Sequence, residues 1–100
     1  MLELSKPHIK RRPLFALGQL LTTPGALRQV GHEEIALAIF GRHVNGDWGD
    51  LCADDRQANE DALKNGDRIL SSYLSAAGTK FWIITEADRA ATTALLPEEY

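Results

Sequence analysis

The C-terminal third of the chain alternates between short apolar runs and short polar turns. Residues 69–76, 80–86 and 91–96 are rich in β-branched and aromatic side chains, which fit a pleated surface. The turns between these runs are only a few residues long, and consecutive strands with such short connections pair antiparallel. The pattern predicts a three-stranded antiparallel meander.

The N-terminal part has the signals of helices. Thr23 followed by Pro24 is a typical helix start, and Gly31 ends the short helix expected over 24–30. A densely apolar segment over 32–42 predicts a second, buried helix.

A third helix is expected over 54–65, on the surface because its only large apolar residue is Leu63. Asp54 would cap its start, and Gly66 would close it. Residues 14–21 are apolar and flanked by Pro13 and Thr22; they fit either a strand or a buried helical turn, and their length favours a strand.

Together these elements predict an α+β fold, with two to three N-terminal helices packed on one face of an antiparallel sheet of three strands. Residues 14–21 would supply a fourth strand. Residues 1–12 are polar, basic and interrupted by Pro7, which indicates a tail, so the expected organisation is a tail over 1–12 and a single α+β domain over 13–100.

Composition narrows the class of protein. The 100 residues are 44% hydrophobic and include one cysteine, which excludes an internal disulfide, and no apolar run has the ~20 residues of a membrane span. We therefore expect a soluble cytoplasmic protein that does not enter a membrane. The net charge is −3, but Lys10, Arg11 and Arg12 make the N-terminal arm basic. That arm could touch nucleic acid or remain a solvated tail.

The segment with the most chemistry is the 43–53 loop, His-Val-Asn-Gly-Asp-Trp-Gly-Asp-Leu-Cys-Ala. Its two glycines disfavour helix and strand. Trp48 lies between two Gly-Asp pairs; it either presents an exposed anchor to a partner or folds back over the core. In the first case, the binding residues would be Asn45, Asp47, Trp48 and Asp50.

Two chemical uses of the same loop are open alternatives. His43 precedes Asp47 by four residues, so that the carboxylate could orient the imidazole for acid–base chemistry, with Arg68 and Arg89 as candidate cations. Alternatively, the acids could hold a divalent ion, although their spacing does not match an EF-hand. The acids in question are Asp47, Asp50, Asp54 and Asp55. Helix and turn capping explains these acids equally well, and we expect neither metal nor cofactor.

Four blocks of the sequence resemble a family of small bacterial proteins found on plasmids, integrative elements and genomic islands. The blocks are Leu-Gly-Gln-Leu with Thr-Pro-Gly-Ala-Leu (17–27), His-Val-Asn-Gly-Asp-Trp-Gly-Asp (43–50), Trp-Ile-Ile-Thr-Glu-Ala-Asp-Arg (82–89) and Leu-Leu-Pro-Glu-Glu-Tyr (95–100). Some members are labelled as a type I restriction–modification subunit, but this chain lacks the Asn-Pro-Pro-aromatic motif and the glycine-rich loop of a methyltransferase. The resemblance implies an accessory role on mobile elements and assigns no functional residues.

Three functions follow as hypotheses. The first is a non-catalytic module that binds an unknown protein partner through the 43–53 loop. This hypothesis suits a chain that is acidic outside its basic arm and shows no recognisable set of catalytic residues. The second is a small toxin-like nuclease or transferase that uses His43 and Asp47. The third is a DNA-binding regulator that acts through the basic arm.

Overall fold

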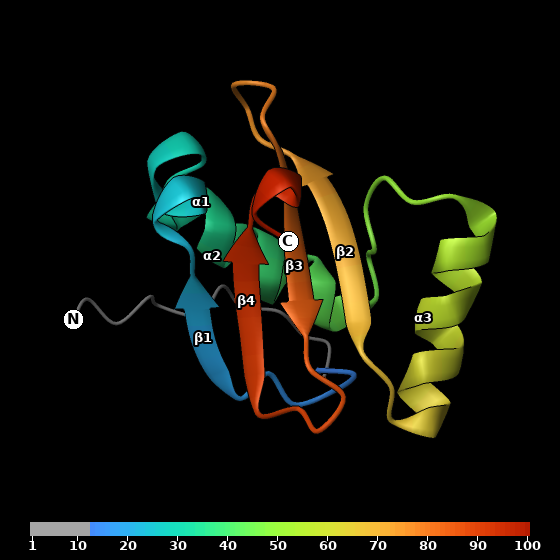
Figure 1. Ribbon diagram of the computed structural model, residues 1–100. Coiled ribbons are helices and arrows are strands. Elements are labelled where there is room, and N and C mark those ends of the chain that lie inside the picture. Colours follow the sequence, from blue (N-terminus) through green and yellow to red (C-terminus); the bar gives the residue numbers. More distant parts are fainter. Residues whose placement is uncertain (1–12) are drawn as a thin grey trace.

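The computed structural model describes residues 13–100, which form a four-stranded sheet with three α-helices (Figure 1). The strands are β1 (Gln19–Thr22), β2 (Ile69–Leu74), β3 (Lys80–Thr85) and β4 (Ala91–Leu95), in the order β1-β4-β3-β2. The helices are α1 (Pro24–Gln29), α2 (His32–Gly41) and α3 (Ala53–Asn65), with 3₁₀ turns η1 (His43–Asn45) and η2 (Pro97–Glu99). The predicted α+β class is confirmed.

The sheet is mixed, whereas the sequence pattern predicted an antiparallel one. Strands β2, β3 and β4 form the expected meander, but β1 pairs with β4 in parallel. A parallel pair needs a crossover connection, and here the whole chain between β1 and β4 supplies it. The 14–21 segment therefore contributes a strand, though a shorter one than its apolar run.

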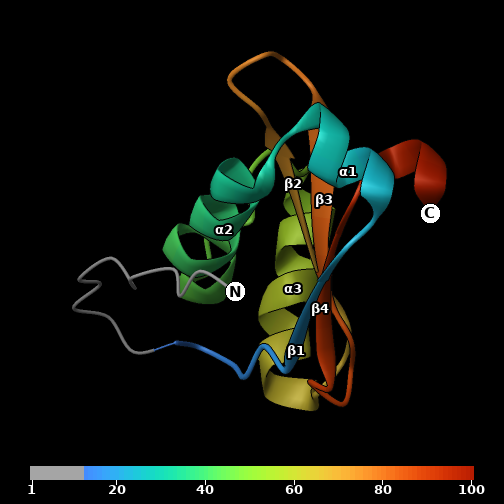
Figure 2. The ribbon, with the colours of Figure 1, turned by 90° about the vertical axis from the view of Figure 1, so that its left-hand side faces the viewer.

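Helix α2 covers one face of the sheet, as the side view shows (Figure 2). Its Ile35 and Ile39 pack with Tyr73, Phe81 and Ile83 of the sheet in the main core. No α-helix of residues 13–100 covers the opposite face, which we call the open face. Helix α3 does not lie on a face with α2; it runs beside β2 at the edge of the sheet (Figures 1 and 2).

Local capping signals place the helix ends. The Thr23 hydroxyl accepts a hydrogen bond from the amide of Ala26 (3.1 Å), and Gly66 closes α3 in a left-handed conformation, both as predicted. The predicted Asp54 cap is wrong. Cys52 is the N-cap residue of α3, and no side chain caps the helix there. Among residues 13–100, no helix has the length and apolarity needed to cross a bilayer.

Candidate functional site

The 43–53 loop closes the outer edge of β2. The amide of Asp50 donates to the Ser72 carbonyl (2.7 Å), and the amide of Ser72 donates to the Trp48 carbonyl (3.1 Å). Gly49 forms a parallel bridge with Ser72 and has φ +74°; a Cβ here would lie 2.0 Å from the Ser72 carbonyl oxygen. Glycine is therefore required for this close approach.

Trp48 is buried, with 3% of its surface exposed, so of the two alternatives it folds back over the core and is not an exposed partner anchor. Its ring stacks with Phe15 at 6.3 Å between centroids and packs in a small core with Ala62 and Ile69. The indole Nε1 donates to Glu60 on α3 (2.9 Å). Trp48 thus holds the loop and α3 against the sheet.

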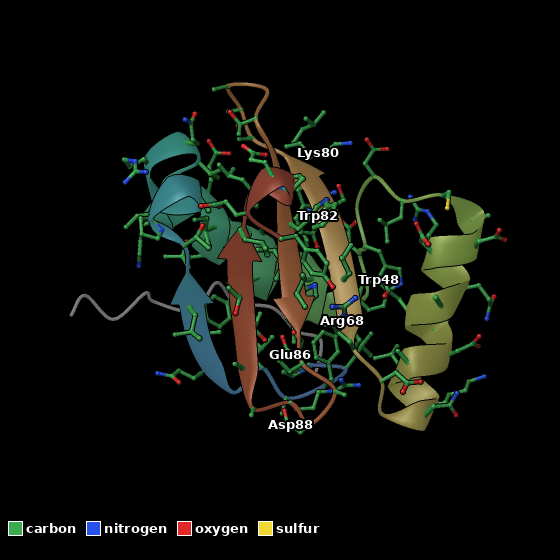
Figure 3. All side chains as sticks on the ribbon, viewed as in Figure 1. Trp48, Arg68, Lys80, Trp82, Glu86 and Asp88 are labelled. Atoms are coloured by element: carbon green, nitrogen blue, oxygen red, sulfur yellow. The ribbon has the colours of Figure 1, made fainter. Side chains whose placement is uncertain are left out.

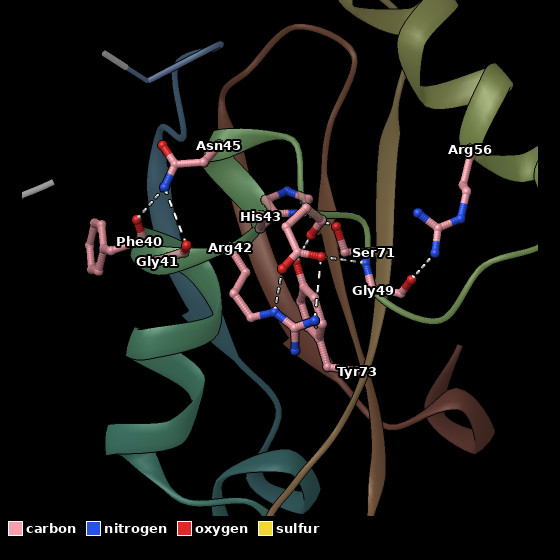
Figure 4. Close-up of polar contacts among 10 residues, drawn as sticks. Phe40, Gly41, Arg42, His43, Asn45, Gly49, Arg56, Ser71 and Tyr73 are labelled. Atoms are coloured by element: carbon pink, nitrogen blue, oxygen red, sulfur yellow. Dashed lines mark hydrogen bonds and ion pairs between the residues drawn. The ribbon is translucent and has the colours of Figure 1, made fainter. Parts of the chain in front are cut away.

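The neighbouring polar residues of the loop bond to the chain itself (Figure 4). Arg42 Nε donates to the Asp47 carboxylate (2.7 Å), and this guanidinium holds the pKa of Asp47 below its usual value. The side-chain amide of Asn45 donates to the carbonyls of Phe40 and Gly41 at the end of α2. Asn45 therefore ties the loop to the end of α2, and Asp47, which also accepts from the Gly49 amide (3.1 Å), holds the turn of the loop.

His43 is fully buried, and both of its ring nitrogens bond to hydroxyl groups instead of the Asp47 carboxylate, which contradicts the alternative of a His43–Asp47 acid–base pair. Its Nδ1 lies 2.6 Å from the Ser71 hydroxyl, and its Nε2 lies 2.9 Å from the Thr85 hydroxyl. The chain of bonds continues from Thr85 to Thr92 (2.7 Å) and ends where the Thr92 hydroxyl donates to the Leu17 carbonyl (2.7 Å).

This series of hydrogen bonds determines the tautomer of the His43 ring. Because Thr92 donates its proton to a carbonyl, it must accept from Thr85, and Thr85 must then accept from His43 Nε2–H. His43 Nδ1 therefore accepts from Ser71. Desolvation, with the charge of Arg89 as a smaller cause, lowers the pKa of His43 to about 3. The neutral imidazole connects β2 with β3. The lone pair on Nδ1 accepts the Ser71 hydroxyl proton, so it is not available to act as a base.

The other candidate residues are dispersed. Arg89 donates to four backbone carbonyls, including that of Ala62 near the end of α3 and that of Asp67. Arg68 donates to the hydroxyl of Tyr100. No three His, Cys, Asp or Glu side chains of the described chain gather as a metal site. Asp54 and Asp55 lie in the first turn of α3, where carboxylates favour the helix dipole.

A different site is present on the open face. A groove of about 430 Å³ runs between the start of α3 and strands β2 and β3, within the range of ligand-binding clefts. Half-buried Trp82 forms part of its lining, with Lys80 above it and Arg68 below it in the view of Figure 3. Asp50 and Asp55 line the groove from the loop and α3.

The groove combines an aromatic surface with free charges of both signs. The side chains of Lys80, Asp50 and Asp55 are exposed, and none is ion-paired within residues 13–100. The Trp82 and Tyr100 rings form a T-shaped pair at 5.7 Å between centroids, and the Arg68 guanidinium lies over the Tyr100 ring at 5.3 Å. This arrangement can stack a flat or apolar group on Trp82 and pair charged groups along both walls.

Sequence reasoning named Asp50, Asp55, Arg68 and Lys80 as candidates for other chemistry and missed Trp82 as a site residue. The signal was the period of two in β3, where Lys80 and Trp82 share one face and Phe81 and Ile83 share the other. The register confirms this division, since Trp82 lies opposite Ser72 of the open face, whereas Phe81 lies opposite Tyr73 of the core.

Comparison of the chain with protein-family models, with curated proteins and with solved structures finds no match. The candidate site therefore rests on the geometry described above.

Proposed function

We propose that this protein is a non-catalytic accessory protein that binds a segment of a protein partner in the open-face groove. The observation that carries the proposal is a groove of about 430 Å³ that combines half-buried Trp82 with unpaired charges of both signs. The mobile-element setting suggested by the sequence resemblance belongs to the same proposal.

The charges favour a polypeptide over a nucleic acid. Two acids and two bases line the groove, and the whole chain has a net charge of −3, whereas phosphate backbones select concentrated positive charge. A polypeptide can supply an apolar side chain for Trp82 together with charges of both signs for the walls. Lys10, Arg11 and Arg12, the residues behind the DNA-binding hypothesis, lie outside the described residues.

The placement of the 43–53 loop also supports a binding role for the groove. Of the four binding residues expected there, Trp48 is buried, and Asn45 and Asp47 bond to the chain itself; Asp50 lines the groove. A module that binds through the groove would use the loop as a rigid wall, in which Asp50 and Leu51 line the binding surface.

A random peptide-display library tests the proposal without knowledge of the partner. We expect selection against the full chain to enrich peptides that bind the wild type and lose about tenfold or more in affinity on Trp82→Ala, the size typical of a hot-spot residue. Lys80→Glu should also weaken binding. Lys64→Glu, the same charge change on the exposed surface of α3 outside the groove, should not.

Backbone amide NMR shifts on adding the selected peptide should cluster around Trp82, Lys80 and Asp55. Selected peptides that bind Trp82→Ala as tightly as the wild type, or a selection that enriches nothing, would overturn the proposal. A single-stranded oligonucleotide that produced the same shifts in place of peptides would assign the groove to nucleic acid and also overturn it.

A further inference from the structure

The outer edge of β1 has free backbone groups. The amides of Gln19 and Thr23 donate toward β4, to Ala90 (2.9 Å) and Ala94 (3.0 Å). Since alternate residues of a strand direct their backbone groups to opposite sides, the N–H and C=O groups of Leu20 and Thr22 point away from the sheet. Within residues 13–100, no strand pairs with this side of β1.

The side chains of β1 leave this edge open to pairing. Leu20 and Leu21 are 44% and 43% exposed. The strand sequence Gln-Leu-Leu-Thr contains no charge and no proline, the residues that usually protect an edge strand from pairing with another chain. Beside it, β1 and α2 enclose an apolar groove of about 90 Å³ lined by Ile35, Ile39 and Phe40.

We propose that a second copy of this chain pairs with the edge, β1 against β1, antiparallel about a two-fold axis that passes beside Leu21. In this register, Leu20 lies opposite Thr22 of the second copy and Thr22 opposite its Leu20. Each of these pairs exchanges two N–H···O bonds, which satisfies the outward groups of both strands. The two Leu21 side chains meet on the open face, in the close contact of a non-hydrogen-bonded pair.

The other edge of the sheet explains why the occupant is a second copy. The outward groups of β2 at Leu70 and Ser72 are already bonded to Asn59 and to the 43–53 loop. Pairing at β1 therefore joins two four-stranded sheets into one sheet with a β2 strand at each outer edge. The outward groups of Leu70 and Ser72 on both of these β2 strands already have partners. A two-fold pair closes at two subunits, and in it each free outward group of β1 meets the same kind of group on the second copy.

The same register fits the apolar groove. Leu20 of the second copy stands opposite Thr22, which lines the groove together with His32 and Ile35. A pair of four-residue strands buries less than the ~1,600 Å² of a standard interface. We therefore expect a weak dimer whose population rises with concentration.

Sedimentation velocity of the full chain, from about 10 µM to about 1 mM, tests the pairing. The wild type should shift from monomer to dimer over this range. Leu21→Lys and Leu21→Glu should each weaken the dimer by about tenfold or more, because each places like charges opposite one another at the axis. An equimolar mixture of the two variants should restore it, because Lys then faces Glu.

Leu37→Lys is the matched control, since Leu37 is 56% exposed on α2 and lies toward β2 and β3, outside the groove beside β1. This variant should associate as the wild type does. In a Cys52→Ser background, Leu21→Cys should form a disulfide-linked dimer under oxidation, because Cα atoms of a non-hydrogen-bonded pair lie within disulfide range.

A wild type that stays monomeric at the highest concentration would overturn the proposal, as would a dimer that Leu21→Lys leaves unchanged. A mixture of the two charged variants that fails to restore the dimer would overturn the register. The groove beside Trp82 takes no part in these measurements, so their outcome is independent of the proposed function.

Discussion

The two edges of the sheet differ in whether their outward backbone groups have hydrogen-bond partners. At β2, the Asn59 side chain on α3 accepts from the Leu70 amide (3.2 Å) and donates to the Leu70 carbonyl (2.7 Å), as a neighbouring strand would. The 43–53 loop does the same at Ser72. At β1, the outward groups of Leu20 and Thr22 have no such partner in the described chain.

This difference shows what the 43–53 loop does in the fold. An exposed edge strand invites pairing with other chains, and the loop removes that hazard at one edge while leaving it at the other. Its glycines, acids and tryptophan look like a site in the sequence, yet most of them serve this closure. The chemistry available to a partner lies next to the closed edge, on the open face.

The closed edge should be most sensitive at Gly49. Gly49→Ala places a Cβ 2.0 Å from the Ser72 carbonyl oxygen at φ +74°, so the loop must move away from β2. We expect a loss of about 3 kcal/mol in the free energy of unfolding, measured by denaturant titration.

Gly78→Ala is its control, because Gly78 also has positive φ (+88°) but meets nothing within 4 Å. This substitution should cost only about 1 kcal/mol, the strain of the left-handed backbone. Equal losses at the two positions would show that the close approach to β2 contributes nothing.

The next effect comes from His43, the first residue of the same loop, which connects β2 with β3 through Ser71 and Thr85. Its pKa is lowered to about 3 in the folded chain, against about 6.5 for an unfolded histidine. Below pH 6.5 the unfolded chain therefore binds a proton that the folded chain does not, and the free energy of unfolding falls as the pH falls. Between pH 7 and pH 4.5 we expect a loss of about 2.5 kcal/mol from this residue.

The measurement is the difference between the wild type and His43→Gln across this range, since the carboxylates contribute equally to both. His43→Gln lowers stability at pH 7 but should remove the slope assigned to the imidazole. A slope that persists unchanged in the variant would show that His43 is not buried in its neutral form.

A feature of the fold could be predicted from the sequence when the residues that cause it are neighbours along the chain. The start of α1 at Thr23-Pro24, the end of α3 at Gly66 and the β2–β3–β4 meander follow from neighbouring residues, and all were predicted. The parallel pairing of β1 with β4 joins residues some seventy positions apart. Periodicity within a segment carries no information about such a partner.

The candidate site could not be predicted from the sequence because its residues are also brought together by contacts between distant parts of the chain. His43 finds its partners 28 and 42 residues away, at Ser71 and Thr85, so its proximity to Asp47 in the sequence was misleading. The sequence pattern drew attention to Trp48 as the candidate binding aromatic and gave Trp82 no such role. Only the tertiary arrangement buries the first and leaves the second half-buried in a groove.

The sharpest contrast between the edges pairs Asn59→Ala with Leu21→Lys. Asn59→Ala leaves the Leu70 amide and carbonyl without their partner at a partly buried position, and we expect a loss of about 2 kcal/mol in the free energy of unfolding. Leu21→Lys changes a side chain that is 43% exposed beside free backbone groups. Below the concentration at which the chain associates, we expect it to change stability by about 0.5 kcal/mol or less.

Both values come from denaturant titrations at about 1 µM, far below the range in which a weak dimer forms. Gln57→Ala, on the exposed surface of the same helix, is the control, because it removes a side-chain amide that bonds to the exposed side chain of Asp61. A large loss in Leu21→Lys would show that the monomer itself depends on β1's side chains and that the edge is not free to recruit a second copy. A small loss of stability, together with weaker association at high concentration, would show that Leu21 contributes to pairing but not to folding. No such separation is possible at the closed edge of β2, where the outward groups are bonded within the fold.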